Sequence, residues 1–263
     1  MASTAEQTDS FTRSELMVIA ASRALHDDDV VFVGIGLPNL ACNLAKRLHA
    51  PRLQMVYESG IYGANPERQP LSMGDPCLVS GCACVSPLSE IFMFYLQRGL
   101  IDVGFLGGAQ VDRYGNLNTT VIGDYKSPRV RLPGSGGACD IASLAKKIFI
   151  ICTQSRKSFV ERVEFVTSAG YLADGHRPQR ACGGGPQLVV TDLGVYDFAN
   201  RGQMTVVSLH PGVCPEEVRS NTGWDIEVPA RVPTTQPPAA KELRILREQL
   251  DPNHYYLKGA STS

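Results

Sequence analysis

The sequence lacks long apolar runs and lacks an excess of charge of either sign. Its most apolar stretches, VVFVGIGL and KKIFIICT, are far shorter than the roughly 20 residues that a membrane-spanning helix needs. The 263 residues include 25 basic and 26 acidic side chains, so no overall field favours nucleic acid or an anionic membrane. The amino-terminal MASTAEQTDSFTRSE is polar and has neither the basic nor the apolar part of a signal peptide. We therefore expect a cytoplasmic protein with no nucleic-acid or membrane partner.

The eight cysteines lack the spacing of metal or redox motifs. Cys82 and Cys84 form the close pair, and the single residue between them differs from the two-residue gap of common zinc and redox sites. No histidine lies near them in the sequence, and the other cysteines are scattered through apolar contexts. We expect buried free thiols in a reducing compartment, and no metal site.

The order of apolar patterns predicts an α/β fold. TRSELMVIAASRAL has helical spacing and places Thr12 and Glu15 as a capping box. Strand-like segments (VVFV, LQMVYE, IDVGFL, KKIFIICT, PQLVVTD, MTVVSL) are separated by helical segments or by glycine-rich connections, residues 59–87 form a long loop, and VRSNTGWDIEV is expected to add a late strand. This pattern predicts a single open, largely parallel sheet with helices on both faces. One domain is expected over residues 1–263, with a proline-rich connector and a terminal helix from about residue 229.

Glycine-rich turns follow or precede several expected strands. Gly34 and Gly36 resemble a dinucleotide-binding turn, but Asn39 stands where the third glycine belongs and Pro38 intrudes, so a tight turn at a helix start is favoured over a nicotinamide site. Three further turns lack the Lys-Ser/Thr ending of a phosphate-binding loop; they hold Gly107 and Gly108, then Gly134, Gly136 and Gly137, then Gly183, Gly184 and Gly185. Together they supply backbone N–H groups that suit an oxyanion or a phosphate at one end of a parallel sheet.

A carboxylate ends the apolar strand LQMVYESG, where Glu58-Ser59-Gly60 begins the loop. Taken alone, a glutamate at a strand end is most often simply solvated. A glutamate is also ionised near neutral pH and can attack a carbonyl without a partner base. Gly60 allows a sharp turn behind it and keeps the approach clear.

Four motifs in order resemble the β subunit of the class I coenzyme A transferases, most closely the glutaconate type. They are VYESG, GGAQVDRYGN, IGDYKSPRVRLPGSGGACDIAS and GPQLVVTDLGV, and the resemblance runs from about Thr12 to Asp251. It implies that Glu58 is the catalytic nucleophile. It further implies that Ser59, Gly60, Gly134, Gly136 and Gly137 supply the oxyanion and CoA-site backbone. A homologous α subunit would complete the active site, and the coenzyme A thioester would be a substrate, with no other cofactor.

The resemblance implies transfer of CoA between short dicarboxylic acids such as glutaconate, through a glutamyl-CoA thioester. A 3-oxoadipate CoA-transferase subunit, an acyl-CoA hydrolase or decarboxylase on the same fold, and a non-catalytic partner subunit stay open. Relatives that hydrolyse or decarboxylate replace the glutamate that this chain keeps. Arg129 or Arg131 could bind a substrate carboxylate, although surface or subunit-interface charges are the favoured interpretation. Tyr125 and Ser127 stay unassigned, and His210 is expected to be a packed loop histidine.

Overall fold

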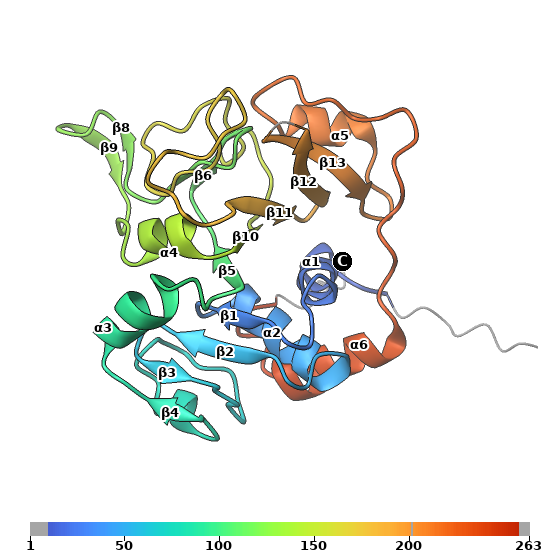
Figure 1. The fold of residues 1–263 in the computed structure, drawn as a ribbon. Coiled ribbons are helices and arrows are strands. Elements are labelled where there is room, and N and C mark those ends of the chain that lie inside the picture. The colour runs from blue at the N-terminus through green and yellow to red at the C-terminus, as the bar shows by residue number, and fades with distance from the viewer. Residues whose placement is uncertain (1–9, 201, 258–263) are drawn as a thin grey trace, which may run out of the picture.

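The computed structural model describes residues 10–200 and 202–257 (Figure 1). The polar segment 1–9, in which no signal peptide is expected, lies outside these residues. The helices are α1 (Arg13–Arg23), α2 (Leu37–Leu48), η1 (Pro76–Val79), α3 (Leu88–Glu90), η2 (Ile91–Leu96), α4 (Ala138–Leu144), α5 (Pro215–Ser220), α6 (Ala240–Arg244) and η3 (Ile245–Leu250). The strands are β1 (Val30–Phe32), β2 (Gln54–Tyr57), β3 (Ile61–Tyr62), β4 (Cys84–Val85), β5 (Val103–Leu106), β6 (Gln110–Val111), β7 (Leu117–Asn118), β8 (Val121–Gly123), β9 (Pro128–Arg131), β10 (Lys147–Ile151), β11 (Pro186–Val190), β12 (Gly194–Asn200) and β13 (Gln203–Leu209).

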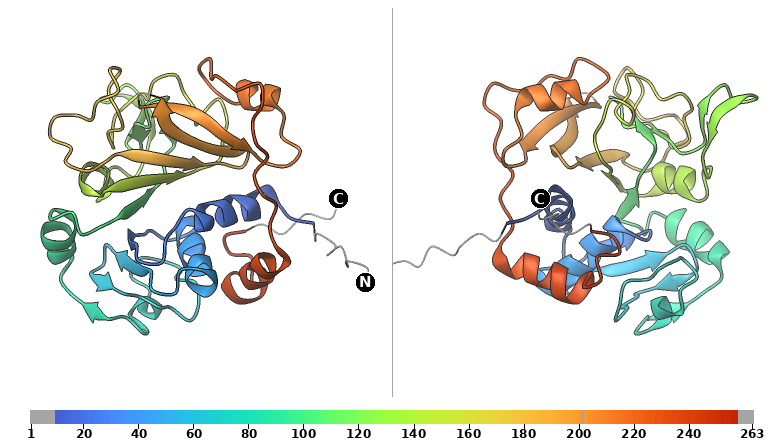
Figure 2. Two further views of the ribbon diagram at one scale, coloured as in Figure 1. Left: turned by 45° about the vertical axis from the view of Figure 1, so that its right-hand side comes forward. Right: turned by 180° about the vertical axis from the view of Figure 1, so that it is seen from behind.

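One nine-stranded sheet joins the two halves of the molecule that Figures 1 and 2 show. Its order is β13-β12-β11-β10-β5-β1-β2-β3-β4. The central strands β11, β10, β5, β1 and β2 are parallel, whereas β12, β13, β3 and β4 are added antiparallel at the two edges. The prediction of an open, largely parallel sheet is confirmed, and the antiparallel edges are an addition to it.

Helices cover both faces of the sheet, as the sequence predicts. Val31 and Val33 belong to the apolar cluster under α1, α2, α6 and η3, whereas Phe32 belongs to the cluster under η2, α4 and α5. The strand periodicity of two turns successive side chains to opposite faces, so a strand covered on both sides must be apolar throughout. This is why VVFV and IFII read as continuous apolar runs.

Ion pairs fasten the terminal helices to α1. The capping box of Thr12 and Glu15 is present, and Arg247 donates from Nε to Glu15 Oε1 at 2.6 Å. Burial opposes ionisation of Glu15, but the hydrogen bonds from Arg247 and Thr12 outweigh it and lower the pKa of the carboxyl. Arg23 and Glu242 form a second pair at 2.6 Å. None of the described helices is long and apolar enough to cross a membrane.

Three local predictions need correction. The late strand expected in VRSNTGWDIEV is wrong: Val218–Ser220 end helix α5 and the following residues form no strand. Pro215 and the two glutamates after it start that helix, because proline suits a first helical turn and acidic side chains suit its amino-terminal end. The expected loop at 59–87 contains β3, η1 and β4. The hairpins β6–β7 and β8–β9 were also missed, because two- to four-residue strands carry too few side chains to show a period.

Candidate active site

The reversal of strand order lies between β1 and β5. The chain passes from β1 to β2 on one side and later places β5 on the other side of β1. Open α/β sheets bind ligands at the carboxyl ends of the strands near such a reversal. The turn of Gly34 and Gly36 follows β1, Glu58 follows β2, and Gly107 follows β5, so all three lie at this edge.

The Glu58 turn is a tight reversal between β2 and β3. Its closing hydrogen bond runs from the Gly60 N–H to the Tyr57 carbonyl at 3.0 Å. Gly60 has φ of +99°, and a Cβ atom on it would lie 1.8 Å from the Ser86 carbonyl oxygen. Ser86 in turn donates its backbone N–H to the Gly60 carbonyl at 2.8 Å. Glycine is therefore required at position 60 by both backbone conformation and space.

Buried polar contacts fix the residue before the glutamate. The Tyr57 hydroxyl donates to the side-chain carbonyl of Asn39, whose amide donates to Gln69 at 2.5 Å. Burial raises the pKa of Tyr57 far above its ordinary value, so the hydroxyl stays a neutral donor. Asn39, which breaks the dinucleotide fingerprint, thus anchors the strand that carries Glu58.

The structure brings the GSGG turn to Glu58. A Cβ atom on Gly137 would lie 3.5 Å from Glu58 Oε2, in ordinary contact, and 2.5 Å from Cζ of Phe92, which is too close. Gly134 is held to Thr119 by two 2.8 Å hydrogen bonds, one to each backbone group. Among the hydrogen bonds of the described residues, none is donated by the N–H of Gly136 or of Gly137. The Glu58 carboxylate, Gly137 and the Phe92 ring therefore lie together on one side of the site.

Glu58 itself is half-buried, and Ser59 is exposed. Within the described residues, the Glu58 carboxylate takes part in no hydrogen bond or ion pair. Phe92 packs at 5.5 Å from Phe32, between ring centroids, and gives the site an apolar wall.

The other glycine turns shape the fold. Gly36 has φ of +95° and precedes α2, which fits a tight turn at a helix start. Gly183 donates to the Ser143 carbonyl at 2.7 Å, and a Cβ atom there would lie 2.2 Å from the Ala145 carbonyl oxygen. This turn is a close backbone contact against the end of α4.

Arg129 and Arg131 lie on the hairpin β8–β9, which projects from the edge of the molecule (Figure 1). Arg129 faces Glu164 at 3.5 Å. Arg131 donates to the Tyr125 carbonyl at 2.9 Å and stacks on the Tyr125 ring. No described contact joins either arginine to Glu58.

His210 is a packed residue. Its Nε2 lies 2.8 Å from the Thr191 carbonyl, and its Nδ1 lies 3.0 Å from the Thr235 hydroxyl. Because a carbonyl only accepts, Nε2 carries a proton. Burial lowers the pKa of His210 and so favours the neutral ring.

The cysteines are free thiols in the described residues, but the expectation that they are buried is wrong for Cys84, Cys182 and Cys214, which are exposed. Burial raises the pKa of Cys152 to about 12. Within residues 10–200 and 202–257, no three His, Cys, Asp or Glu side chains converge as a metal site would require.

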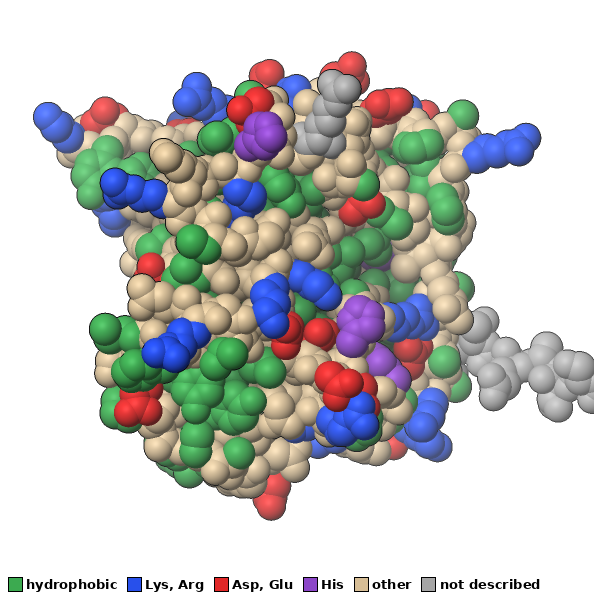
Figure 3. Space-filling model, viewed as in Figure 1, with side chains coloured by type: hydrophobic (Ala, Val, Ile, Leu, Met, Phe, Trp, Pro, Cys, Tyr) green, Lys and Arg blue, Asp and Glu red, His purple; other side chains and the backbone are tan. Residues whose placement is uncertain are grey.

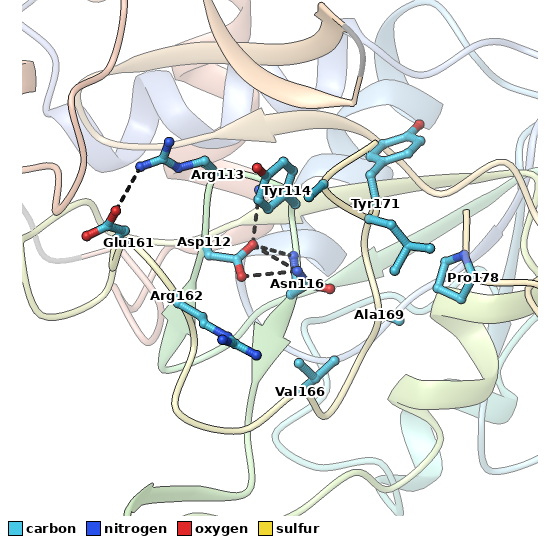
Figure 4. A pocket seen from close by; sticks show the side chains of 12 residues that line it. Asp112, Arg113, Tyr114, Asn116, Glu161, Arg162, Val166, Ala169, Tyr171 and Pro178 are labelled. Carbon is cyan, nitrogen blue, oxygen red and sulfur yellow. Dashed lines mark hydrogen bonds and ion pairs between the residues drawn. The ribbon is translucent and has the colours of Figure 1, made fainter. Parts of the chain in front are cut away.

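A cleft of about 1090 Å³ lies away from Glu58 and was not foreseen from the sequence (Figure 4). It is lined by the β6–β7 turn and by the loop from Glu161 to Pro178. Asp112 accepts from the N–H groups of Tyr114 at 3.0 Å and Asn116 at 3.1 Å, and Arg113 pairs with Glu161 at 3.3 Å. The motif GGAQVDRYGN signals this turn, but its partner loop is distant in sequence.

Comparison with known proteins defines the class. A family model described as coenzyme A transferase matches residues 14–221. The chain therefore belongs to the coenzyme A transferase family. A subunit of the 3-oxoadipate CoA-transferase of Pseudomonas knackmussii is 49% identical over 240 residues, covering 90% of this chain and 92% of that protein. A subunit of the glutaconate CoA-transferase of Acidaminococcus fermentans is 35% identical over 256 residues, covering 94% and 96%.

Solved structures agree with this class. The crystal structure of glutaconate coenzyme A-transferase from Acidaminococcus fermentans superposes with a TM-score of 0.88 at 32% identity, covering 94% of this chain and 98% of that one. The decarboxylase AibA/AibB matches with a TM-score of 0.81 at 26% identity, with the same coverage. The resemblance to CoA-transferase β subunits is confirmed, and the 3-oxoadipate protein is more similar than the glutaconate protein.

Proposed function

We propose that this chain is the glutamate-bearing subunit of a CoA-transferase that exchanges coenzyme A between short dicarboxylic acids. The observation that carries the proposal is the approach of Gly137 to Glu58, where a Cβ atom would lie 3.5 Å from Oε2. It joins a carboxylate at the end of β2 to a glycine turn 79 residues away, counted from Glu58 to Gly137, with free backbone donors at its centre.

The reaction needs a nucleophile and a place for developing negative charge. Glu58 attacks the acyl-CoA carbonyl, and the C–S bond breaks to give a mixed anhydride and CoA thiolate. The thiolate then attacks the glutamyl carbonyl of the anhydride, releasing the first acid as its carboxylate and leaving a glutamyl-CoA thioester. The acceptor carboxylate repeats the two steps in reverse and restores Glu58. No general base is required, because the attacking groups are already anions.

The backbone N–H groups of Gly136 and Gly137 are suited to stabilise the oxyanion of each tetrahedral intermediate. Removing one such donor typically costs about 100- to 1000-fold in kcat. Ser59 is exposed and leaves the approach to Glu58 open on that side. We propose that the opposite wall comes from a homologous α subunit, since both transferase relatives are, by name, single subunits of larger enzymes. No cofactor beyond the CoA thioester substrate enters these steps.

Similarity favours 3-oxoadipate over glutaconate as the acid, at 49% against 35% identity. Both are dicarboxylates, so one carboxylate reacts and the other needs a cation or hydrogen-bond donors. Arg129 and Arg131 are exposed; Arg129 pairs with Glu164 and Arg131 with the Tyr125 carbonyl, so a role on that second carboxylate requires the hairpin to meet the acyl group in the assembled enzyme.

The experiment mixes the chain with its cognate α subunit and supplies succinyl-CoA with 3-oxoadipate, glutaconate or no acceptor. The proposal expects acyl-CoA exchange that depends on a dicarboxylate acceptor. Decarboxylation or hydrolysis is the second candidate, because the decarboxylase AibA/AibB shares the fold. Free acid or carbon dioxide formed at the same rate without an acceptor would establish that candidate and overturn the transfer.

A further inference from the structure

The carboxyl-terminal segment after η3 is folded around a buried carboxylate. Asp251 directly follows η3. Its Oδ1 accepts the backbone N–H of Tyr255 at 2.8 Å. Its Oδ2 accepts the backbone N–H groups of Tyr256 at 3.0 Å and of Leu257 at 2.8 Å. Because hydrogen bonds to an ionised carboxylate are stronger than neutral ones, Asp251 sets the path of residues 251–257.

This segment is buried at both ends. Figure 1 shows α6 below α1, and Figure 3 shows charged side chains of both signs over the region of α1, α2 and α6. Asp251 and Leu257, in contrast, are 2% and 3% exposed, and Leu257 belongs to the apolar cluster under these helices. The segment is therefore a packed part of the fold and can constrain the residues that it contacts.

Tyr256 joins the segment to two connections near the candidate active site. Its hydroxyl donates to the Pro70 carbonyl at 2.5 Å, in the loop between β3 and η1. Its ring lies beside Gly36, where a Cβ atom would be 3.9 Å from Cδ1 of Tyr256. Gly36 precedes α2 at the carboxyl end of β1, the same edge of the sheet as Glu58. Tyr256 thus contacts both the turn after β1 and the loop that follows the Glu58 turn.

Buried hydrogen bonds continue from this loop to the residue before Glu58. Gln69, which adjoins Pro70 in the sequence, accepts from the Asn39 amide at 2.5 Å. Asn39 in turn accepts from the Tyr57 hydroxyl. The three side chains of this network are between 0% and 6% exposed, and hydrogen bonds in such surroundings strengthen one another. Contacts therefore run without interruption from the terminal segment to the end of the strand that carries the nucleophile.

We propose that Asp251 and Tyr256 are positioning residues for Glu58. Asp251 sets the path of the terminal segment, Tyr256 fixes the loop at Pro70, and the buried hydrogen bonds carry this constraint to the end of β2. The inference rests on the proposed function, which assigns the covalent step to Glu58. Misplacement by about 1 Å at a reacting centre costs about 100-fold in rate, so a contact remote from the substrate can change kcat without changing substrate binding.

The first test is Tyr256→Phe, which removes the hydroxyl and keeps the ring beside Gly36. In the enzyme assembled with its cognate α subunit, kcat and the single-turnover rate of thioester formation on Glu58 should each fall about 10-fold. The Kd for CoA, measured by calorimetry, should stay within about twofold. The matched control is Tyr255→Phe, because Tyr255 is 63% exposed and its hydroxyl makes no hydrogen bond within the described residues. This control should keep kcat within about twofold.

Two further variants test the route of the constraint. Asp251→Asn has one carbonyl oxygen in place of two and loses at least one of the three backbone donors, so it should reproduce the loss of kcat. Gln69→Leu interrupts the same network. Combined with Tyr256→Phe, it should lower kcat no further than the more damaging single change, whereas independent effects would multiply. Multiplied losses would overturn the inference.

Hydrogen exchange of the isolated chain measures the constraint without catalysis. The Gly60 N–H is protected by its bond to the Tyr57 carbonyl at 3.0 Å. Tyr256→Phe should speed exchange of this amide at least about fivefold and leave exchange in β10 unchanged, and Tyr255→Phe should change neither. Equally faster exchange in β10 would indicate a general loss of stability and overturn the inference.

The inference and the proposed function fail on different results. In an enzyme that transfers CoA, Tyr256→Phe must change both the exchange of the Gly60 amide and kcat, and either change without the other overturns the positioning role. If the wild-type enzyme forms no thioester on Glu58, the proposed reaction is refuted. Selective loosening of the Gly60 amide in Tyr256→Phe would then still establish that the terminal segment holds the turn, and its absence would overturn that as well.

Discussion

The Glu58 turn and the cleft around Asp112 are built on opposite principles. The cleft has a volume of about 1090 Å³, but its carboxylate has a structural role. Asp112 accepts hydrogen bonds from the backbone of its own turn and from the side chain of Asn116. The Glu58 carboxylate, in contrast, has no hydrogen-bond or ion-pair partner among the described residues. A carboxylate without a partner is therefore a better guide to a reactive site than the volume of a cleft.

The largest difference is expected between Glu58→Ala and Arg162→Ala. Loss of the nucleophile should lower kcat of the assembled enzyme by about 10,000-fold or more, because the covalent step is assigned to Glu58. Arg162→Ala in the cleft should leave kcat within about twofold. Steady-state assays on both variants, with CoA binding measured by calorimetry, check the contrast. Comparable losses of kcat in both variants would make the cleft part of the active site.

Gly137→Ala should have the next largest effect. The new methyl group would lie 2.5 Å from the Phe92 ring and must displace it toward or away from Glu58. Misplacement by about 1 Å at a reacting centre costs about 100-fold, so kcat should fall between about 10- and 100-fold. Because φ of Gly137 is −80°, the backbone tolerates alanine. The double variant Gly137→Ala with Phe92→Leu makes room and should recover part of kcat; no recovery would place the defect elsewhere.

Asp112→Ala should affect stability and spare catalysis. Burial is the main cause that raises the pKa of Asp112, and its hydrogen bonds to Tyr114 and Asn116 only partly offset this. Deleting the acceptor leaves these donors unpaired, at a cost of about 2 kcal/mol in the free energy of unfolding. Asp112→Asn keeps an acceptor and should lose less. Urea unfolding of the isolated chain measures the cost, and a kcat loss in a folded Asp112→Asn enzyme would contradict a purely structural turn.

The smallest effect concerns pH and His210. Since burial lowers its folded pKa, the unfolded chain binds a proton first as pH falls below about 6.5, and stability drops from there until the folded pKa is reached. The slope is at most about 1.4 kcal/mol per pH unit. His210→Gln removes this pH dependence. The difference in unfolding free energy between the wild type and His210→Gln should therefore become smaller from pH 7.5 to pH 5.5. A constant difference would mean that His210 does not stay neutral.

Most of the fold could be predicted from long segments in which apolar residues recur with a regular spacing. The strands leading into Gly34, Glu58 and Gly107 were predicted because a sheet covered on both faces requires continuous apolar runs. The short edge strands and β8–β9 were not, since pairing there depends on partners distant in sequence. Helix α4 was missed because its seven residues follow a glycine turn.

The candidate site was likewise predicted from the sequence only in part. Glu58 and the GSGG turn were named from motif order, and their contact depends on the tertiary fold. Phe92 had no signal, because a phenylalanine in an apolar helix resembles any core residue. The contact between Tyr57 and Asn39 could not be predicted either, since nothing in a strand pattern indicates a buried hydrogen bond between a hydroxyl and an amide.

The central claim is that Glu58 carries the covalent intermediate. The direct measurement incubates the assembled enzyme with acyl-CoA and no acceptor, followed by proteolysis and mass spectrometry. The account predicts a CoA thioester on the peptide containing Glu58, its absence in Glu58→Ala, and irreversible inactivation by borohydride, which reduces a thioester and spares a carboxylate. An adduct on Cys82 or Cys139 instead, or CoA transfer by Glu58→Ala, would contradict it.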